Sequence, residues 1–285
     1  MTLRPRELSR SVASFPARTP TLPPATHTNS YALGARDVVL VEPATPYEDE
    51  QRAWLEWARA LPSSGRVPKA IVVTHHHVDH VGGVDVLSRE LGLPLWAHAE
   101  TASRIGAPVE RMLAEGDIID LAGPVPERWR VLHTPGHAPG HVCLLDEAGT
   151  LVVGDMVASV GTILIAPGDG DMKVYLEQLE RLAALDARLA LPAHGEPIDT
   201  PSLLFRRYVA HRLMREAKVL AAVAGHGVEG ATDDQLLPEA YDDTPVTIWP
   251  IALLSLRAHL AKLEGEGRIR VDARSTERPR YIAGR

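Results

Sequence analysis

The most informative segment of this 285-residue chain is Thr74-His75-His76-His77-Val78-Asp79-His80. A strand-like apolar run from Ala70 to Thr74 leads into it, and Gly82-Gly83 then opens a predicted helix from Val84 to Leu91. Side chains alternate along an extended chain, so His75 and His77 face one way and His76 the other. As the chain turns toward the helix, Asp79 and His80 can reach a neighbouring point. The stretch therefore predicts two adjacent metal sites.

The available side chains limit which metals fit. Neutral imidazole and carboxylate groups suit Zn²⁺, with Mn²⁺ and Fe²⁺ as alternatives. The chain has one cysteine, Cys143, which excludes an internal disulfide and a Cys-rich zinc site, and a reducing compartment fits best. Any metal must therefore be held by histidines and carboxylates.

Three further candidate ligands follow, each at the end of a predicted strand. They are His137 in Thr134-Pro135-Gly136-His137, Asp155 in Val153-Gly154-Asp155, and His194 in Leu191-Pro192-Ala193-His194-Gly195. The neighbouring Gly and Pro residues predict tight turns at the edge of the core, where sites are built. Any one of these residues taken alone is most simply a polar surface group, but together they indicate one shared site.

Strand-like and helix-like segments alternate on both sides of the His-rich stretch. Predicted strands cover Val38–Glu42, Leu93–Ala97, Trp129–His133, His141–Leu145, Leu151–Val153 and Leu189–Pro192, and predicted helices cover Glu50–Leu61 and Val174–Leu185. Residues 1–30 are predicted to hold one strand and then a Pro/Thr-rich loop. This alternation is typical of an α/β layered domain.

The C-terminal part of the chain has a different pattern. Helices are predicted over Leu203–Val223, Asp233–Tyr241 and Pro250–Glu264, and two short strands over Arg268–Asp272 and Arg280–Ile282 flank a polar turn. Three helices followed by a hairpin is the order of a winged helix. We therefore predict a catalytic domain over residues 1–204 and a small winged-helix-like domain over residues 205–285.

Composition excludes several classes of protein. With 45% hydrophobic residues, 24% charged residues and a net charge of -7, the chain is neither wholly disordered nor a purely basic nucleic-acid binder. No apolar run approaches the roughly 20 residues of a membrane-spanning helix, so we expect a soluble protein with no membrane partner. The N-terminal stretch lacks the continuous apolar segment of a secretory signal, which predicts a cytoplasmic location.

The ordered set His75-x-His77-x-Asp79-His80, Pro-Gly-His137, Gly-Asp155 and His194-Gly resembles the metallo-β-lactamase superfamily. The resemblance implies an αββα sandwich with the site at one edge of its two sheets. It also implies that one metal ion is held by His75, His77 and His137, a second by Asp79, His80 and His194, and that Asp155 bridges the two. The zinc β-lactamases lack a bridging Asp at this step, whereas glyoxalase II, lactonases, RNA-processing nucleases and phosphodiesterases of this fold have one, so antibiotic hydrolysis is disfavoured.

The C-terminal segment extends the resemblance to nearly the whole chain. The predicted winged helix, with His211-Arg212-x-x-Arg215-Glu216 and the segment from His259 to Ile269, is similar to the lactamase-beta-like protein 2 group, whose animal members are single-strand endoribonucleases. That group typically has Asp-Thr-Gly after its early strand, where this chain has Val41-Glu42-Pro43-Ala44. The departure bears on loop geometry and substrate more than on metal binding.

These observations predict a hydrolase in which hydroxide bridging two divalent metal ions cleaves an ester, thioester or lactone. Asp79 would steer the hydroxide and pass its proton to the leaving group. The alternative is a single-strand endoribonuclease or phosphodiesterase that uses the same site. The 5% of aromatic residues and the acidic charge favour a small-molecule substrate over single-stranded RNA. The winged-helix-like domain could bind nucleic acid, cover the site or form a homo-oligomer contact.

Two side chains outside the ligand set have two interpretations each. Tyr175 either donates a phenol hydrogen bond to substrate or belongs to the apolar face of its helix. His141, four residues after His137, either orients a metal ligand or lies at a strand end without such a role.

Overall fold

The computed structural model describes residues 4–272 and 278–284, which form two compact units. The first unit contains the chain up to Thr134, together with Ala138–Ile163 and Asp186–Pro201. The second contains Pro135–His137, Leu164–Leu185 and the chain from Ser202 onward. Compactness thus assigns two segments before residue 204 to the second unit, because the helix within the longer segment packs against the C-terminal helices. The predicted domain boundary at residues 204/205 stays a prediction.

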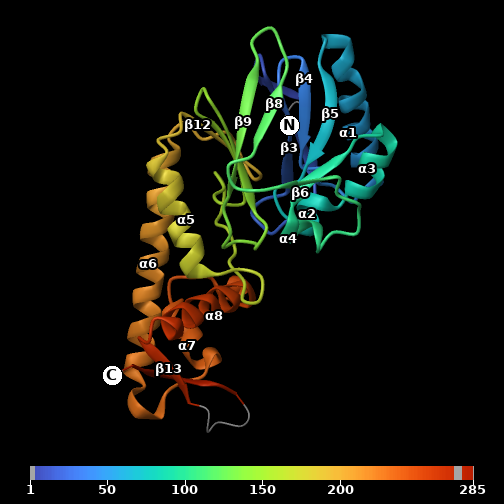
Figure 1. Ribbon diagram of the computed structural model, residues 1–285. Helices are drawn as coiled ribbons and strands as arrows, with labels where there is room; N and C mark the ends of the chain where they lie inside the picture. Colours follow the sequence, from blue (N-terminus) through green and yellow to red (C-terminus); the bar gives the residue numbers. More distant parts are fainter. Residues whose placement is uncertain (1–3, 273–277, 285) are drawn as a thin grey trace. The chain divides into compact units, whose positions relative to one another are not determined.

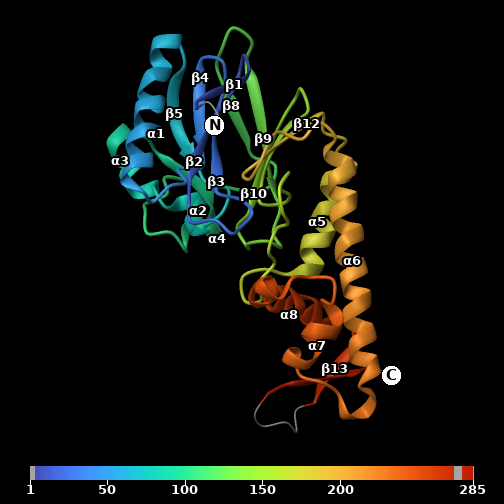
Figure 2. The same cartoon turned by 180° about the vertical axis from the view of Figure 1, so that it is seen from behind.

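The first unit contains two β-sheets (Figure 1 and Figure 2). One has seven strands in chain order: β1 (Arg6–Ser9), β2 (Val12–Arg18), β3 (His27–Leu33), β4 (Asp37–Val41), β5 (Val67–Val72), β6 (Leu95–His98) and β7 (Arg111–Leu113). The other has five strands in the order β12 (Leu189–Pro192), β11 (Thr150–Gly154), β10 (Val142–Asp146), β9 (Glu127–His133) and β8 (Ile118–Leu121). Pairing is parallel from β4 to β7 and between β11 and β12, and antiparallel elsewhere in these sheets.

Alternation along β4 gives the seven-stranded sheet two apolar faces. Val39 and Val41 belong to one buried cluster, and Val38 and Leu40 belong to another. The first cluster also contains residues of the five-stranded sheet, such as Trp129 of β9, so the two sheets pack face to face. All five side chains are fully buried. Burial on both faces explains why the β4 sequence is a continuous apolar run.

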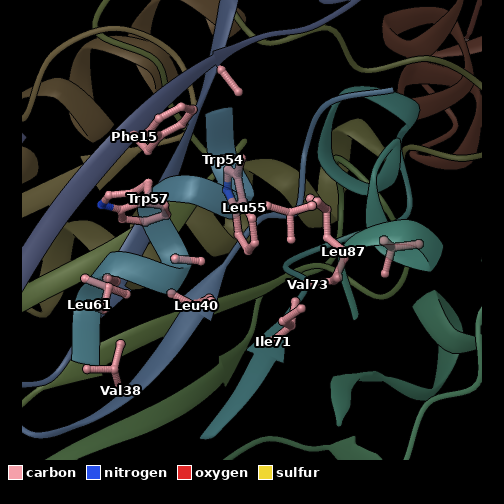
Figure 3. Close-up of a cluster of buried hydrophobic side chains, with 14 of the residues drawn as sticks. Phe15, Val38, Leu40, Trp54, Leu55, Trp57, Leu61, Ile71, Val73 and Leu87 are labelled. Atoms are coloured by element: carbon pink, nitrogen blue, oxygen red, sulfur yellow. The ribbon is translucent and has the colours of Figure 1, made fainter. Parts of the chain in front are cut away.

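Two amphipathic helices, α1 (Glu48–Ala60) and α3 (Val84–Leu91), cover the outer face of the seven-stranded sheet. In Figure 3, Trp54 and Trp57 of α1 lie with Phe15 in this second cluster. The rings of Phe15 and Trp57 stack with their centroids 5.3 Å apart. The helices give the sandwich one outer helical layer. The other helices of this unit are short: η1 (Leu61–Ser64), α2 (Val78–Val81) and α4 (Ala99–Ala102).

The N-terminal segment holds more strand than the expected single strand and loop. Both β1 and β2 precede residue 19, and β3 already begins at His27. The polar residues Thr28, Asn29 and Ser30 of β3 are buried. Asn29 Nδ2 donates to the carbonyl oxygens of Pro192 at 3.0 Å and Gly195 at 2.8 Å. These partners lie far away in the sequence, so hydrophobic periodicity alone misses the strand.

The second unit contains the winged helix and the helices that pack with it. Its elements are α5 (Met172–Ala184), α6 (Pro201–Gly225), η2 (Gly227–Glu229), α7 (Asp233–Ala240), η3 (Val246–Ile248), α8 (Trp249–Gly265), β13 (Ile269–Asp272) and β14 (Arg280–Ala283). Residues of α6, α7, α8 and β13 share one buried apolar cluster, and β13 pairs antiparallel with β14. The polar turn predicted between these two strands falls on residues 273–277, outside the described residues.

The expectation that no apolar run approaches the length of a membrane-spanning helix is not met: among the described residues, the helical stretch Val246–Gly265 is long and apolar enough to cross a membrane, and 33% of its apolar 18-residue window is buried. The core helix of a soluble protein can meet the same criterion. Within this stretch, Leu256, Leu260 and Leu263 of α8 lie in the apolar cluster of the second unit. Its apolar composition therefore has an explanation within the fold.

Candidate metal centre

Strands of both sheets in the first unit end where the candidate ligands begin. His75 follows β5, while Asp155 and His194 follow β11 and β12, which are parallel neighbours and therefore end at the same sheet edge. The short helix α2 adds Asp79 and His80. Two groups of potential ligand atoms result, with the atoms of each group within 4.8 Å of one another: His75, His80 and Asp155 in one, and Asp79, His80 and His194 in the other.

His75 and His77 meet as the strand alternation predicts. His75 Nε2 lies 3.0 Å from His77 Nδ1, and the two ring planes are at 83°. The other ring nitrogen of His75 lies 3.0 Å from Thr74 Oγ1. Nitrogens this close can bind one cation together. With His77 included, six of the seven predicted ligands lie in one cluster of the first unit.

The second half of the cluster is two carboxylates against two imidazoles. Asp155 Oδ1 lies 3.6 Å from His80 Nε2 and 3.4 Å from His194 Nε2. Asp79 approaches the same two nitrogens, with Oδ1 at 3.9 Å from His80 Nε2 and Oδ2 at 3.5 Å from His194 Nε2. His80 is fully buried, and Asp155 and His194 are 7% and 5% exposed. Ionisable groups this buried and close are strongly coupled electrostatically.

Burial and charge act against each other in this cluster, and charge dominates. Burial lowers the pKa of His80, but the carboxylates of Asp155, Asp79 and Glu42 hold it well above its usual range. Burial raises the pKa of Asp155, but His194 and His80 hold it well below its usual range. Burial also lowers the pKa of His194, and Asp155 raises it above the ordinary value. The cluster therefore favours positive charge at its centre.

One buried atom tests whether these residues fit metal ions. His80 Nε2 faces Asp155 and Asp79 at distances too long for hydrogen bonds, and it has no hydrogen-bond partner among residues 4–272 and 278–284. An unsatisfied buried nitrogen is costly. A divalent cation bound by this nitrogen and the neighbouring carboxylates would satisfy it, and mixed imidazole and carboxylate donors are normal ligands for such ions. The residues thus fit a dinuclear metal site.

A hydrogen bond to the backbone determines which nitrogen of His194 can bind a metal. Its Nδ1 donates to the carbonyl oxygen of His27 at 3.0 Å, so Nε2 keeps its lone pair. This is the nitrogen that faces Asp155 and Asp79. The backbone contact therefore orients His194 for metal binding.

His137 lies in the second unit, on the segment Pro135–His137. Its Nδ1 donates to the carbonyl oxygen of Leu164 at 2.9 Å, which leaves Nε2 as the possible ligand atom. Gly136 has a φ of 123°, and a Cβ there would lie 2.4 Å from the backbone of Tyr175. This close approach explains the glycine before His137. The place of His137 in the ligand set stays a prediction.

Tyr175 is fully buried in α5. The guanidinium of Arg212 lies 5.8 Å from the centroid of its ring. Leu176, Leu179 and Leu182 of the same helix are also buried, so Tyr175 belongs to the buried face of α5. A hydrogen bond from its phenol to substrate stays a prediction.

His141 supports the backbone of Asp155. His141 Nε2 accepts a hydrogen bond from the Asp155 amide at 3.1 Å, and its Nδ1 donates to Thr134 Oγ1 at 2.8 Å. Gly154 has a φ of 48°, and a Cβ there would lie 2.5 Å from His141 Nε2. The glycine before Asp155 therefore lets the turn approach His141. Of the two interpretations of His141, the structure favours the one in which it orients a ligand.

Glu42 is the neighbour of the cluster that sequence reasoning did not select as functional. It is 1% exposed, and its Oε2 lies 3.3 Å from His80 Nδ1. The sequence does contain a signal for Glu42, namely an acidic residue at the end of a predicted apolar strand, in Val41-Glu42-Pro43-Ala44. This segment stands out in the sequence only because it departs from the Asp-Thr-Gly pattern.

Comparison with known proteins agrees with this geometry. Residues 23–194, more than half of the chain, match the Metallo-beta-lactamase superfamily. The chain belongs to this superfamily. Residues 232–277 match the beta-lactamase associated winged helix domain, which confirms the predicted combination of a metallo-beta-lactamase sandwich with a C-terminal winged helix.

Similar proteins extend the match along most of the chain. A beta-lactamase-like protein 2 homolog of Drosophila melanogaster is 29% identical over 269 residues, covering 88% of this chain and 86% of that protein. Thioesterase pkgB of Emericella nidulans is 32% identical over 158 residues, covering 55% of this chain and 43% of that protein. A metallo-beta-lactamase family protein from Thermus thermophilus, of known crystal structure, has 25% identity and a TM-score of 0.78, covering 97% of this chain and 100% of that chain. The superfamily match and these relatives identify a metal-dependent hydrolase.

Proposed function

We propose that this superfamily hydrolase cleaves an ester, thioester or lactone at a dinuclear metal centre. The observation that carries the proposal is the position of Asp155 Oδ1, 3.6 Å from His80 Nε2 and 3.4 Å from His194 Nε2. Asp155 groups with His75, which we propose for one ion, and with His80, which we propose for the other, so its buried carboxylate can bridge two cations. Similarity to a protein named a thioesterase supports a carbonyl substrate.

In this proposal the seven ligands divide as the superfamily resemblance implies. His75, His77 and His137 would hold one ion, Asp79, His80 and His194 the other, and Asp155 both. Two divalent ions bound there would lower the pKa of a coordinated water and polarise the substrate carbonyl. We propose Zn²⁺ because the donors are mostly imidazole nitrogens, and Mn²⁺ and Fe²⁺ are the alternatives to test.

Asp79 is the residue we propose for handling the proton. Its side chain is 14% exposed, more than the 10% of Asp155, and both of its oxygens face the imidazoles of the cluster. A carboxylate at this place can accept a hydrogen bond from the attacking water and carry its proton to the leaving group. The C–O or C–S bond then breaks: an ester or thioester gives a carboxylic acid and an alcohol or thiol, and a lactone gives a single hydroxy acid.

The second candidate is cleavage of single-stranded RNA, or of another phosphodiester, at the same site. The winged-helix match over residues 232–277 favours it, because such modules can bind nucleic acid. The net charge of -7 opposes it, since a nuclease needs a basic surface for the phosphate backbone. We therefore rank carbonyl substrates first.

A substrate panel on metal-loaded protein tests the proposal. The panel holds a thioester, a lactone, a simple phosphodiester and a short single-stranded RNA, and elemental analysis gives the metal content. We expect two equivalents of metal and turnover of the thioester or lactone, with activity lost in Asp155→Ala. RNA cleavage that Asp155→Ala abolishes, with inert carbonyl substrates, would establish the second candidate instead.

A further inference from the structure

We propose that Glu42 is a positioning residue that fixes the tautomer and orientation of His80, and thereby sets the affinity of one of the two metal ions. The inference rests on the proposed dinuclear centre. Glu42 is too far back to be a ligand in either group of the cluster, and it acts only through His80.

The carboxylate of Glu42 contacts the His-rich stretch at both of its ends, Thr74 and His80. Its Oε1 accepts a hydrogen bond from the Thr74 amide at 3.2 Å, at the point where β5 gives way to the ligand stretch. Its Oε2 lies 3.3 Å from His80 Nδ1, on the side of the ring opposite Asp155 and Asp79. Among the described residues, neither Oε2 nor His80 Nδ1 has a hydrogen-bond partner, so their 3.3 Å approach is an electrostatic contact between two buried polar atoms. Each therefore depends on the other.

The backbone holds Glu42 in an unusual conformation. Its φ is 61°, in the left-handed region that non-glycine residues rarely adopt. The Glu42 amide donates to the carbonyl oxygen of Val72 at 3.0 Å, and Ser30 Oγ donates to the Glu42 carbonyl oxygen. A strained residue held from several sides is typical of a functional position. These contacts hold the backbone of Glu42, and from it the side chain brings Oε2 to 3.3 Å from His80 Nδ1.

Chemistry makes the contact directional. A carboxylate has no proton to donate, so its charge beside Nδ1 favours the tautomer of His80 with the proton on Nδ1, and Nε2 then keeps the lone pair that a metal needs. Replacing Glu42 by Gln keeps the size but offers an amide. If the amide oxygen still accepts from Thr74, its NH₂ group faces Nδ1 and favours the opposite tautomer, with the proton on Nε2. The isosteric change therefore opposes metal binding at His80.

Metal affinity, measured by competition with a chromophoric chelator, tests the inference. The proteins are the wild type, Glu42→Gln, Glu42→Asp and the control Glu50→Gln, each loaded with zinc. Glu50 is also buried in the first unit at 7% exposure, but its carboxylate faces Arg4 and Arg18. We expect Glu42→Gln to weaken one of two zinc equivalents about 10- to 100-fold and to leave the other nearly unchanged. Glu42→Asp, which still only accepts, should recover much of this loss, and Glu50→Gln should match the wild type.

Histidine ring ¹⁵N chemical shifts give a second readout, which a purely structural role would not change. In the wild type we expect the ring of His80 to carry its proton on Nδ1. In Glu42→Gln that remains folded, we expect the same ring to carry its proton on Nε2. Wild-type affinities and shifts in folded Glu42→Gln would overturn the inference while leaving the dinuclear centre intact. Equal losses at both zinc equivalents, or in Glu50→Gln as well, would also overturn it. Uptake of fewer than two equivalents by the wild type would instead overturn the dinuclear proposal, and this inference with it.

Discussion

Two buried polar clusters, one in each unit, surround a carboxylate with different partners. In the first unit, Asp155 is opposed by the imidazoles of His80 and His194 at 3.4 to 3.6 Å, and His80 Nε2 has no hydrogen bond among the described residues. In the second unit, Glu216 has direct cationic partners, with Oε2 2.7 Å from Lys262 Nζ and Oε1 2.7 Å from an Arg268 guanidinium nitrogen. A buried carboxylate paired with lysine and arginine supports the fold, whereas one that faces imidazole nitrogens, which can themselves bind metals, suits a metal site.

The two clusters should therefore respond differently to loss of a carboxylate. Loss of a carboxylate in the first unit should lower the metal content, the activity or both, since its partners are proposed metal ligands. Removal of one in the second unit should weaken the fold without changing the metal content. Four substitutions test this contrast and are given in order of decreasing expected effect.

Asp155→Ala should have the largest effect. The substitution removes the proposed bridging ligand, so we expect metal content to fall below two equivalents and kcat/KM to drop about 10³-fold or more, equivalent to at least about 4 kcal/mol of transition-state stabilisation. Elemental analysis and steady-state kinetics measure both. A fully loaded, active variant would contradict the bridging role.

Asp79→Asn should separate proton handling from metal binding. The amide can still coordinate through its oxygen but cannot take up a proton at neutral pH. We expect kcat to fall about 10²- to 10³-fold with a much smaller change in metal content. Parallel losses of metal and activity would instead make Asp79 a ligand with no separate catalytic task.

Glu216→Gln should destabilise the second unit without affecting metal binding. Burial raises the pKa of Glu216, but His259 and Lys262 outweigh it and lower the value from 4.5 to about 2. A carboxyl pKa lower in the folded state adds stability above pH 4.5, and this stability is lost as pH falls from 4.5 toward 2. The shift corresponds to about 3 kcal/mol.

Chemical denaturation at several pH values measures this contribution. The difference in unfolding free energy between wild type and Glu216→Gln should be large at pH 7 and should shrink toward pH 2, while zinc content stays at the wild-type level. A stability difference that does not change with pH, or a loss of zinc, would remove the contrast between the clusters.

His141→Phe should have the smallest effect of the four. Phe fills the fully buried site of His141 but cannot accept the hydrogen bond of the Asp155 amide. We expect metal affinity to fall about 10-fold, because support behind a ligand contributes less than the ligand itself. His259→Phe is the matched control, since His259 is also fully buried but lies in the second unit. Equal effects of the two changes on metal affinity would contradict the positioning role of His141.

Local patterns predicted most elements because local forces determine them. The helix from Val84 to Leu91 has the predicted bounds, with Gly92 at φ 61° ending it. The strand Leu189–Pro192 is also as predicted. By contrast, β3 is rich in polar residues, and its burial depends on the hydrogen bonds of Asn29 to Pro192, the last residue of β12, and to Gly195 in the loop after it. No pattern within the strand carries that information.

The superfamily and the candidate ligands can be predicted without coordinates, because a strand that ends in a short turn dictates the spacing of His75, His77, Asp79 and His80. The groups that contact those ligands from outside the site follow only from the folded structure. Glu42 reaches His80 and His141 reaches Asp155 across segments that are distant in the sequence. Burial converts these contacts into constraints, since a buried imidazole must satisfy one nitrogen with the protein before the other is free for a metal.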